Sequence, residues 1–228
     1  MGLQCGIVGL PNVGKSTLFN ALSNAKAEAA NYPFCTIEPN VGVITVPDES
    51  LQVLEKLVHP EKIIPTFASK GEGLGNKFLG NIREVDAVIH VVRCFEDDNI
   101  VHVSGTVNPV EDKEVIDTEL QLKDLESVDK KIQRLEKIAK SGDAKARTEL
   151  GYVQAYKKHL ESGKNARVLD MPEAGREAVA DLQLLTIKPV IYVANVDEGS
   201  LPAGNQWVEK LKASVAEESA EVVILCAA

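Results

Sequence analysis

A glycine-rich motif near the start of the chain constrains the fold more than any other feature. Residues 9–17 read Gly-Leu-Pro-Asn-Val-Gly-Lys-Ser-Thr, a full match to the pattern G-x-x-x-x-G-K-[ST]. An apolar run at residues 3–8 precedes the motif, and a stretch with apolar residues at helical spacing, from about residue 15 to residue 25, follows it. Because strand, loop and helix occur in this order, we interpret the motif as a phosphate-binding loop (P-loop) rather than as a chance turn.

The side chains of the motif predict nucleotide chemistry. Gly9 and Gly14 let the backbone wrap closely, so that successive N–H groups and the helix N-terminus face an anion. Lys15 would reach the β and γ phosphates as a catalytic residue, and the Ser16 hydroxyl would ligate a bridging Mg²⁺ ion. Thr17 would meet the α phosphate. We therefore expect a Mg²⁺-dependent nucleoside triphosphatase.

Asn12 has two interpretations that the sequence leaves open. Its amide oxygen could help to coordinate a monovalent cation such as K⁺ beside the phosphates. Alternatively, Asn12 is a plain turn residue after Pro11.

Composition limits the class of protein. With 228 residues, 44% of them hydrophobic, the chain can form one well-cored domain or one domain with an insertion. Its four cysteines are scattered without a CxxC pair, and the N-terminus has no basic stretch followed by an apolar segment. No apolar run approaches the roughly 18 to 20 residues that a bilayer span needs. We expect a cytoplasmic protein without membrane contact.

The net charge of −9 argues against broad binding to nucleic acid, so no direct contact with DNA is expected. Residues 130–147 are rich in Lys and Arg and leave a local basic patch open. Acidic residues are interspersed, and we favour the interpretation of this stretch as a solvated helix face.

Short apolar runs predict the rest of the fold. Besides residues 3–8, strands are expected at residues 42–46, 87–92, 189–194 and 222–226, with helical patterns between them. Such alternation predicts an α/β fold, a P-loop NTPase with a doubly wound, mostly parallel sheet that binds its ligand at the carboxyl ends of the strands.

Residues 115–163 break this alternation and carry no strand signal. Apolar residues follow helical spacing in two stripes, Leu125, Val128, Ile132 and Leu135, then Leu150, Val153 and Leu160. We predict an antiparallel helical coiled-coil hairpin inserted into a nucleotide-binding domain made of residues 1–114 and 164–228. The alternative is a pair of ordinary domain helices.

Two further segments are candidates for the nucleotide site. Residues 31–40, Asn-Tyr-Pro-Phe-Cys-Thr-Ile-Glu-Pro-Asn, lie at a suitable distance after the first helix and offer Thr36 as a second Mg²⁺ ligand. His102 follows the strand at residues 87–92 and is a candidate for orienting the attacking water. A surface-loop histidine is the alternative.

The base-reading loop is expected after the strand at residues 189–194. There, Asn195-Val196-Asp197-Glu198 occupies the place of Asn-Lys-x-Asp in GTPases, with Val196 for Lys and Glu198 for Asp. Since the Asp carboxylate of that pattern pairs with the N1–H and amine of guanine, the change weakens guanine preference and favours ATP. Glu198 could still reach a guanine edge.

Together, the P-loop, the segment at residues 31–40, the run Ser-Lys-Gly-Glu-Gly-Leu-Gly-Asn-Lys-Phe at residues 69–78 and Asn-Val-Asp-Glu at residues 195–198 resemble the Obg-like ATPase (YchF) family. The resemblance covers essentially the whole chain. It implies a GTPase-like fold with a coiled-coil insertion, preference for ATP over GTP, Mg²⁺ dependence and association with ribosomes. It also implies nucleotide contacts from Asn12, Val13, Gly14, Lys15, Ser16, Thr17 and Val196, and Mg²⁺ at Ser16 and Thr36.

The sequence departs from that family in two places. Family members carry a strand that ends in Asp-x-x-Gly just before the run at residues 69–78, and here only residues 65–68 stand in its place. Four residues are too few for both a strand and a γ-phosphate loop. The small C-terminal TGS domain of the family is also absent from this sequence.

These observations predict a Mg²⁺-dependent ATPase that hydrolyses ATP, and GTP more weakly, as a ribosome-associated switch. The alternatives are a nucleotide-gated module that binds ribosomes or other proteins through its helical insertion, or an ordinary GTPase with negligible intrinsic turnover.

Overall fold

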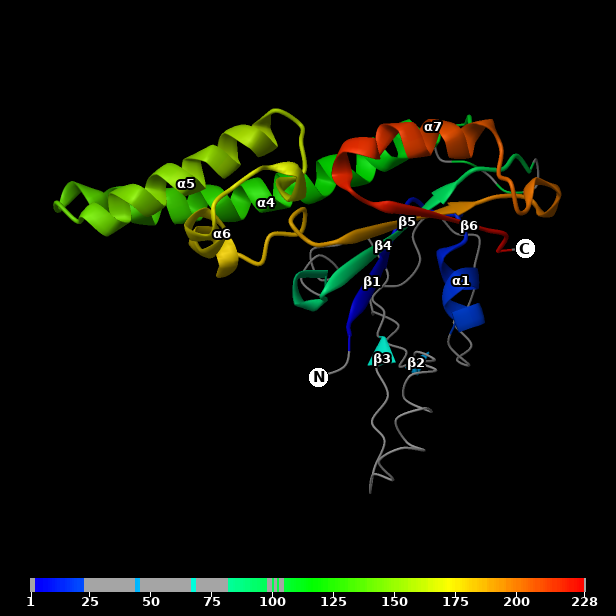
Figure 1. Ribbon diagram of the computed structural model, residues 1–228, viewed down its shortest axis with the longest axis horizontal. Helices are drawn as coiled ribbons and strands as arrows, with labels where there is room; N and C mark the ends of the chain where they lie inside the picture. Colours follow the sequence, from blue (N-terminus) through cyan, green and yellow to red (C-terminus); the bar gives the residue numbers. More distant parts are fainter. Residues whose placement is uncertain are drawn as a thin grey trace, which may run out of the picture.

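A four-stranded parallel sheet forms the centre of the protein (Figure 1). The computed structural model describes residues 3–22, 44–45, 67–68, 82–97, 100, 102 and 105–227. The strands are β1 (Cys5–Val8), β4 (Ala87–Arg93), β5 (Val190–Asn195) and β6 (Glu221–Leu225), and they lie in the order β1-β4-β5-β6. All three pairings are parallel, with Val8 opposite His90 and Asn195 opposite Leu225. The predicted doubly wound parallel sheet is confirmed.

The apolar runs of the sequence become these strands because most residues of β1, β4 and β5 are buried, whereas β6 lies at the edge of the sheet with Glu221 and Val223 exposed. The observed ends differ from the predicted ones by one or two residues. The strand expected at residues 42–46 is described only as β2 (Ile44–Thr45), which pairs antiparallel with β3 (Phe67–Ala68). The remaining residues of that prediction lie outside the described part of the chain.

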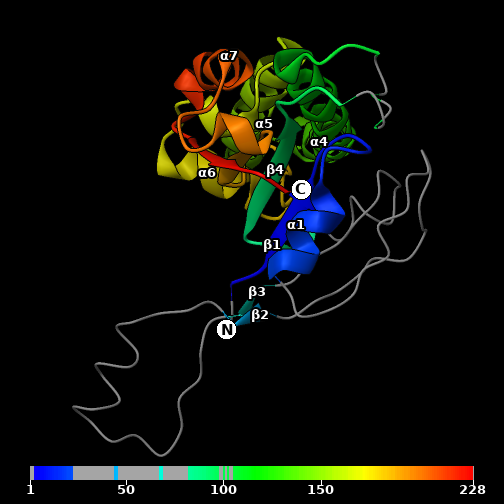
Figure 2. The same ribbon diagram turned by 90° about the vertical axis from the view of Figure 1, so that its right-hand side faces the viewer.

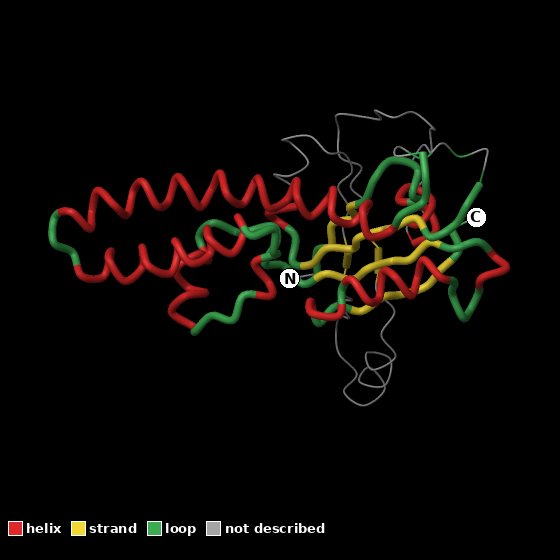
Figure 3. The backbone as a smooth tube through the Cα atoms, turned by 90° about the horizontal axis from the view of Figure 1, so that it is seen from above, coloured by secondary structure: helices red, strands yellow, loops and turns green. Residues whose placement is uncertain are grey.

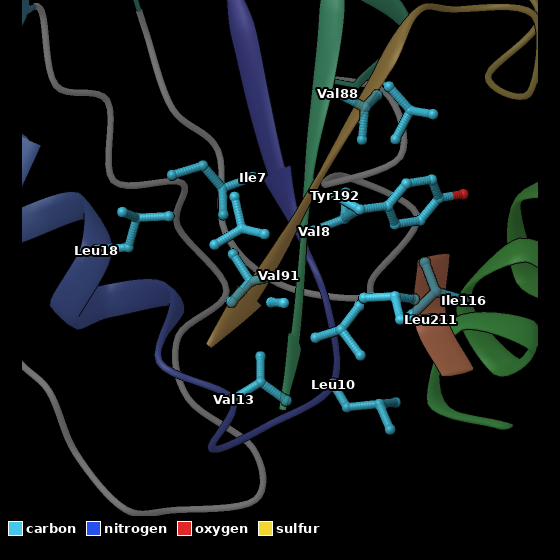
Figure 4. Packing of buried hydrophobic residues seen from close by; sticks show 14 of the residues in the cluster. Ile7, Val8, Leu10, Val13, Leu18, Val88, Val91, Ile116, Tyr192 and Leu211 are labelled. Atoms are coloured by element: carbon cyan, nitrogen blue, oxygen red, sulfur yellow. The ribbon is translucent and has the colours of Figure 1, made fainter. Parts of the chain in front are cut away.

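Helices cover both faces of the sheet. α1 (Lys15–Leu22) lies on one side, and α4 (Pro109–Lys140) lies with α7 (Gln206–Ser214) on the other (Figures 1 and 2). Leu18 of α1, Ile116 of α4 and Leu211 of α7 are buried with the strand residues in one hydrophobic cluster (Figure 4). Burial of such side chains, worth about 1.5–3 kcal/mol each, fixes the helices against the strands that carry the P-loop.

The second half of α4 leaves the sheet and packs along α5 (Ala144–Glu161) as an antiparallel hairpin (Figure 3). Residues 141–143 make the turn, where the Asp143 side chain accepts a hydrogen bond from the Ala146 N–H and caps α5. The predicted stripes meet here: Val128, Ile132, Leu135, Val153 and Leu160 are buried in a second cluster, and Leu125 and Leu150 pack against it.

A third helix joins this second cluster. α6 (Glu173–Ala180) follows the short 3₁₀ turn η1 (Ala166–Val168) and packs on α5, burying Ala178 and Val179. α4 itself runs without a break across residue 115, and its Ile116 and Leu120 belong to the sheet cluster. The division into residues 1–114 with 164–228 and residues 115–163 stays a prediction.

α4 has 32 residues, but its charged side chains are too frequent for a stretch that could cross a bilayer. None of the other helices in the described ranges meets that requirement either.

A buried carboxylate joins the hairpin to the sheet. Glu218 lies in the 3₁₀ turn η3 (Ala216–Glu218) just before β6, with its side chain 9% exposed. Its oxygens lie 2.7 Å from Lys113 Nζ of α4 and 2.7 Å from a guanidinium nitrogen of Arg167 in η1, and Tyr192 of β5 donates its hydroxyl at 3.0 Å. Lys113 also contacts Asp117 at 2.6 Å. This network connects α4, η1, β5 and the entry to β6.

The ion pairs of this network change the pKa of Lys113. Burial alone lowers the pKa of Lys113, but the Asp117 and Glu218 carboxylates outweigh burial and raise that pKa above its ordinary value. Lys113 therefore stays charged, and its charge depends on two partners that are also largely removed from water.

We predict that Glu218→Gln lowers the free energy of unfolding by about 3 kcal/mol, because removing one partner of a buried ion pair leaves uncompensated charge on Arg167. Urea denaturation measures this loss. Glu209→Gln is the matched control, since the Glu209–Lys212 pair is exposed and should contribute less than about 1 kcal/mol. Equal losses in the two variants would contradict the role assigned to Glu218.

Candidate nucleotide-binding site

The P-loop connects the carboxyl end of β1 to the start of α1, as predicted. Leu18 N–H donates to Gly14 O at 2.9 Å, which begins the helix directly after the motif. The N-terminus of α1, with the positive end of the helix dipole, therefore lies at the loop. This arrangement favours an anion at the loop.

The two motif glycines are required by close contacts. Gly9 has φ 147°, and a Cβ atom there would overlap the Val91 carbonyl oxygen of β4. Gly14 has φ 99°, and a Cβ atom would lie 2.5 Å from the Asn195 side-chain nitrogen. Side chains at these positions would push the loop away from the strands, so the sequence pattern has a direct steric reason.

The polar motif residues are half-buried around the loop. Lys15 Nζ donates to Leu10 O at 2.8 Å, so the ammonium group lies against the backbone of the P-loop. Ser16 and Thr17 occupy the first turn of α1. Asn12 has φ 62° in the turn after Pro11, a left-handed conformation that Asn tolerates well. Val13 is buried in the sheet cluster.

Asn195 joins three loops at this edge of the sheet. Its side chain is 3% exposed and sits at the carboxyl end of β5. The Nδ2 group donates to Val13 O in the P-loop at 3.0 Å, and Oδ1 accepts from Ala227 N–H after β6 at 2.9 Å. Asn195 therefore positions the P-loop and the loop after β6 relative to each other. The sequence singled out Asn195 as a base contact but gave no sign of its partners.

The residues after Asn195 form a compact turn. Val196 is 1% exposed, and its N–H donates to Leu225 O at 2.8 Å. Its side chain therefore packs in the core, and a nucleotide contact at this residue would involve its backbone. Glu198 is exposed at the start of the 3₁₀ turn η2 (Glu198–Ser200). The carboxylate of Asp197 accepts from the Ser200 hydroxyl at 2.8 Å.

Asn205 is a structural residue of the site that the sequence reasoning missed. It caps α7 by accepting from the N–H groups of Trp207 and Val208, and its Nδ2 donates to Cys94 O at 2.8 Å. An Asn directly before an amphipathic helix was the available signal. Its contact fixes the loop after β4 to the loop after β5.

His102 lies in a different setting from the surface loop considered as its alternative. Its Nε2 is 2.9 Å from Asp112 Oδ2, with the two side chains 6% and 3% exposed. Burial raises the pKa of Asp112, and the hydrogen bond and charge of His102 act against that rise. This contact gives the imidazole a partner in the first turns of α4. A role in orienting water stays a prediction.

Other predicted parts of the site lie outside the described residues. These are Thr36 with the whole segment at residues 31–40, and the run at residues 69–78. The described structure thus brings the P-loop at residues 9–17 together with Asn195 and Ala227, while Glu198 is exposed in the turn that follows β5.

Comparisons with known proteins agree with a P-loop at the edge of a parallel sheet. Residues 4–140 match the family described as 50S ribosome-binding GTPase. A Bacillus subtilis (strain 168) protein, ribosome-binding ATPase YchF, is 53% identical over 241 residues, with 100% of this chain and 66% of the relative covered. An Escherichia coli O157:H7 protein of the same name is 50% identical over 240 residues, with the same coverages. The chain thus spans just under two thirds of the length of these relatives.

The alignment with the Bacillus protein is longer than the 228 residues of this chain, so the relative carries residues that this chain lacks. A solved structure, that of the Schizosaccharomyces pombe YchF GTPase, matches the fold with a TM-score of 0.80 and 34% sequence identity. It covers 100% of this chain, and this chain covers 66% of it.

We predict that Asn195→Asp weakens nucleotide binding about 10- to 100-fold. The Asp carboxylate still accepts from Ala227 N–H but places an acceptor against Val13 O, a loss of about 1.5–3 kcal/mol. Calorimetric titration measures the affinity, and urea denaturation measures the stability. Asn165→Asp is the control, because Asn165 is similarly buried and accepts from Gln121 far from the loop. Undiminished nucleotide binding in Asn195→Asp would show that the tether does not shape the site.

Proposed function

Because this chain belongs to the 50S ribosome-binding GTPase family, and within it to the YchF (Obg-like ATPase) proteins, we propose that it is a Mg²⁺-dependent ATPase that converts ATP to ADP and phosphate. The observation that carries the proposal is the P-loop itself, whose Gly14 is held against Asn195 at the carboxyl edge of the parallel sheet. A hydrolysis assay with purified protein tests it.

The residues of this chain would supply positioning and charge. Backbone N–H groups of the loop and of the first turn of α1 would hold the phosphate oxygens. Lys15 would exchange its hydrogen bond with Leu10 O for the β and γ phosphates, because a charged acceptor binds the ammonium more strongly than a carbonyl does. Phosphoryl transfer depends mainly on such positioning and electrostatic stabilisation.

The donor chemistry of the site fits Mg²⁺. In the part of the chain that the structure describes, no cluster of three or more His, Cys, Asp or Glu could hold a metal ion by itself. The Ser16 hydroxyl at the start of α1 is a suitable single oxygen ligand, with Thr36 proposed as a second, and nucleotide phosphates would complete the set. When bound, Mg²⁺ neutralises charge that develops on the phosphates. We keep Asn12 as the candidate ligand for K⁺.

The choice of base rests on residues 195–198. The names of the relatives mention both ATPase and GTPase. Glu198 replaces the Asp of the guanine-binding pattern, and Asp197 beside it already accepts from Ser200. Because the Glu198 side chain is longer than that of Asp, its carboxylate would not lie where it can pair with guanine. The site would then discriminate less strongly in favour of guanine. This supports ATP as the preferred substrate, with GTP used more weakly.

We further propose that hydrolysis resets a switch associated with ribosomes in the cytoplasm. The relatives are called ribosome-binding. α4 supports the switch because one unbroken helix packs on the sheet at Ile116 and on α5 at Val128, so a movement of the sheet edge would be transmitted to the hairpin. Slow turnover that ribosomes accelerate favours a switch, whereas fast turnover without a partner favours an independent ATPase. His102 remains the proposed water-orienting residue.

We predict that Lys15→Ala lowers ATP hydrolysis at least about 100-fold, because it removes the cation that stabilises charge on the transferred phosphate. The thermal unfolding temperature should change little, since Lys15 is only half-buried and bonds to its own loop. Lys164→Ala, at an exposed lysine outside the site, is the control. Turnover in Lys15→Ala equal to the unaltered protein would refute the P-loop assignment.

We predict that Glu198→Asp shifts the ratio of ATP to GTP affinity about tenfold toward GTP, equivalent to about 1.4 kcal/mol, because the shorter carboxylate restores the guanine-binding reach. Parallel calorimetric titrations with both nucleotides give the ratio. Glu217→Asp, the same shortening at an exposed residue of η3, should leave it unchanged. An unaltered ratio in Glu198→Asp would mean that other atoms read the base.

A further inference from the structure

The loop that carries His102 leaves the sheet beside the P-loop. It begins directly after β4 at Cys94, whose N–H donates to Asn195 O at 2.7 Å. β4 also borders the motif, because a Cβ atom on Gly9 would overlap the Val91 carbonyl oxygen. His102 therefore belongs to a loop that starts at the same carboxyl edge of the sheet as the candidate nucleotide site.

Arg93, the last residue of β4, holds the backbone of this loop and is 2% exposed. Its Nε donates to Phe95 O at 3.0 Å, and its terminal guanidinium nitrogens donate to Asp97 O at 3.2 Å and to Ile100 O at 2.8 Å. The guanidinium carbon also lies 4.5 Å from the centre of the Phe95 ring. One buried side chain thus fixes three points of the loop, the last of them two residues before His102.

Asp112 of α4 fixes the imidazole ring itself. Its Oδ2 lies 2.9 Å from His102 Nε2, and both side chains are buried. An ionised carboxylate only accepts hydrogen bonds, so Nε2 carries the proton and Nδ1 is the acceptor atom of the neutral ring. The contact therefore sets the tautomer of His102 as well as the orientation of its ring.

The burial of Asp112 goes beyond what α4 requires. A carboxylate in the first turn complements the helix dipole, but the neighbouring Glu111 does so while exposed to solvent. Asp112 is 3% exposed, and its Oδ1 has no hydrogen-bond partner within the part of the chain that the structure describes. Because a buried, incompletely satisfied carboxylate is destabilising, the stability of α4 does not account for this placement. The contact with His102 does.

The charge of Arg93 favours the ionised form of Asp112. Burial raises the pKa of Asp112, whereas the hydrogen bond and charge of His102, and the charge of Arg93, act against that rise. Burial also lowers the pKa of Arg93, and nearby carboxylates, Asp112 among them, oppose this change. The other titratable groups close to the pair are Cys94, Glu96, Asp97 and Glu111.

We propose that Asp112 is a positioning residue for hydrolysis, holding His102 in the tautomer whose Nδ1 accepts a hydrogen bond from the attacking water, while Arg93 holds the loop in place. The inference rests on the proposed function, which gives His102 its role. Asp112 acts only through the imidazole and does not touch the nucleotide. A carboxylate that fixes the tautomer and orientation of a histidine in this way contributes strongly to the rate of a reaction.

The first test is Asp112→Asn, which keeps the shape of the side chain but removes its charge and lets its amide donate to Nε2. We expect kcat for ATP to fall at least about tenfold with little change in KM, because water is oriented less well while ATP binding is untouched. The acidic limb of the pH–rate profile should move to lower pH, since a protonated ring loses the carboxylate that stabilises its charge.

Asp117→Asn is the matched control. Asp117 is also a buried carboxylate of α4, and it contacts a cation of its own, Lys113, at 2.6 Å. The control variant should lose stability in urea, but its kcat should stay within about twofold of the unaltered chain and its pH–rate profile should not move. Equal losses of kcat in the two variants, without a shift of either profile, would overturn the proposal in favour of a structural role for Asp112.

A double-mutant cycle then asks whether Asp112 acts through His102. In a His102→Ala chain, adding Asp112→Asn should lower kcat by less than about twofold, because the ring that it positions is already gone. A further tenfold loss in that background would show that Asp112 acts by another route and would overturn the inference.

NMR of the imidazole nitrogens tests the contact without turnover and without any change at Asp112. The signal of His102 is the one that disappears in His102→Ala, and we expect a single tautomer with its proton on Nε2. A proton on Nδ1, or exchange between the two tautomers, would overturn the inference.

These measurements separate the inference from the proposed function. A single Nε2–H tautomer in a chain that hydrolyses no ATP would support the hold of Asp112 on His102 and contradict the proposed ATPase. Hydrolysis that Asp112→Asn leaves unchanged would overturn the inference and support the ATPase.

Discussion

The two hydrogen bonds of the Asn195 amide are the constraint on which the candidate site depends. Parallel strands bring their carboxyl ends to one edge, but that alone leaves the connecting loops free to move. Asn195 removes this freedom by donating to Val13 O and accepting from Ala227 N–H. Gly14 then has to be glycine, because any side chain would collide with the same amide. The buried Asn195 side chain thus explains why the motif has glycine at residue 14.

The network around Glu218 plays the corresponding role at a distance from the site. It anchors β5 through Tyr192 and precedes β6, the two strands that lead to Asn195 and Ala227. It also engages Lys113 of α4. At 1.5 Å per residue, α4 is about 48 Å long and continues into the hairpin. The site and the hairpin are therefore connected by one continuous helix and by the buried ion pair between Lys113 and Glu218.

Local patterns were enough to predict the P-loop, the parallel strands and the apolar stripes of the hairpin, because each depends on residues close in sequence. Contacts between distant residues were not predictable in the same way. Asn195 and Val13 are 182 positions apart, and no periodicity connects them. The contact of His102 with Asp112 was not predicted either, since nothing in the loop around His102 indicated this buried partner. α6 was missed because its packing on α5 follows from the hairpin geometry rather than from its own short sequence.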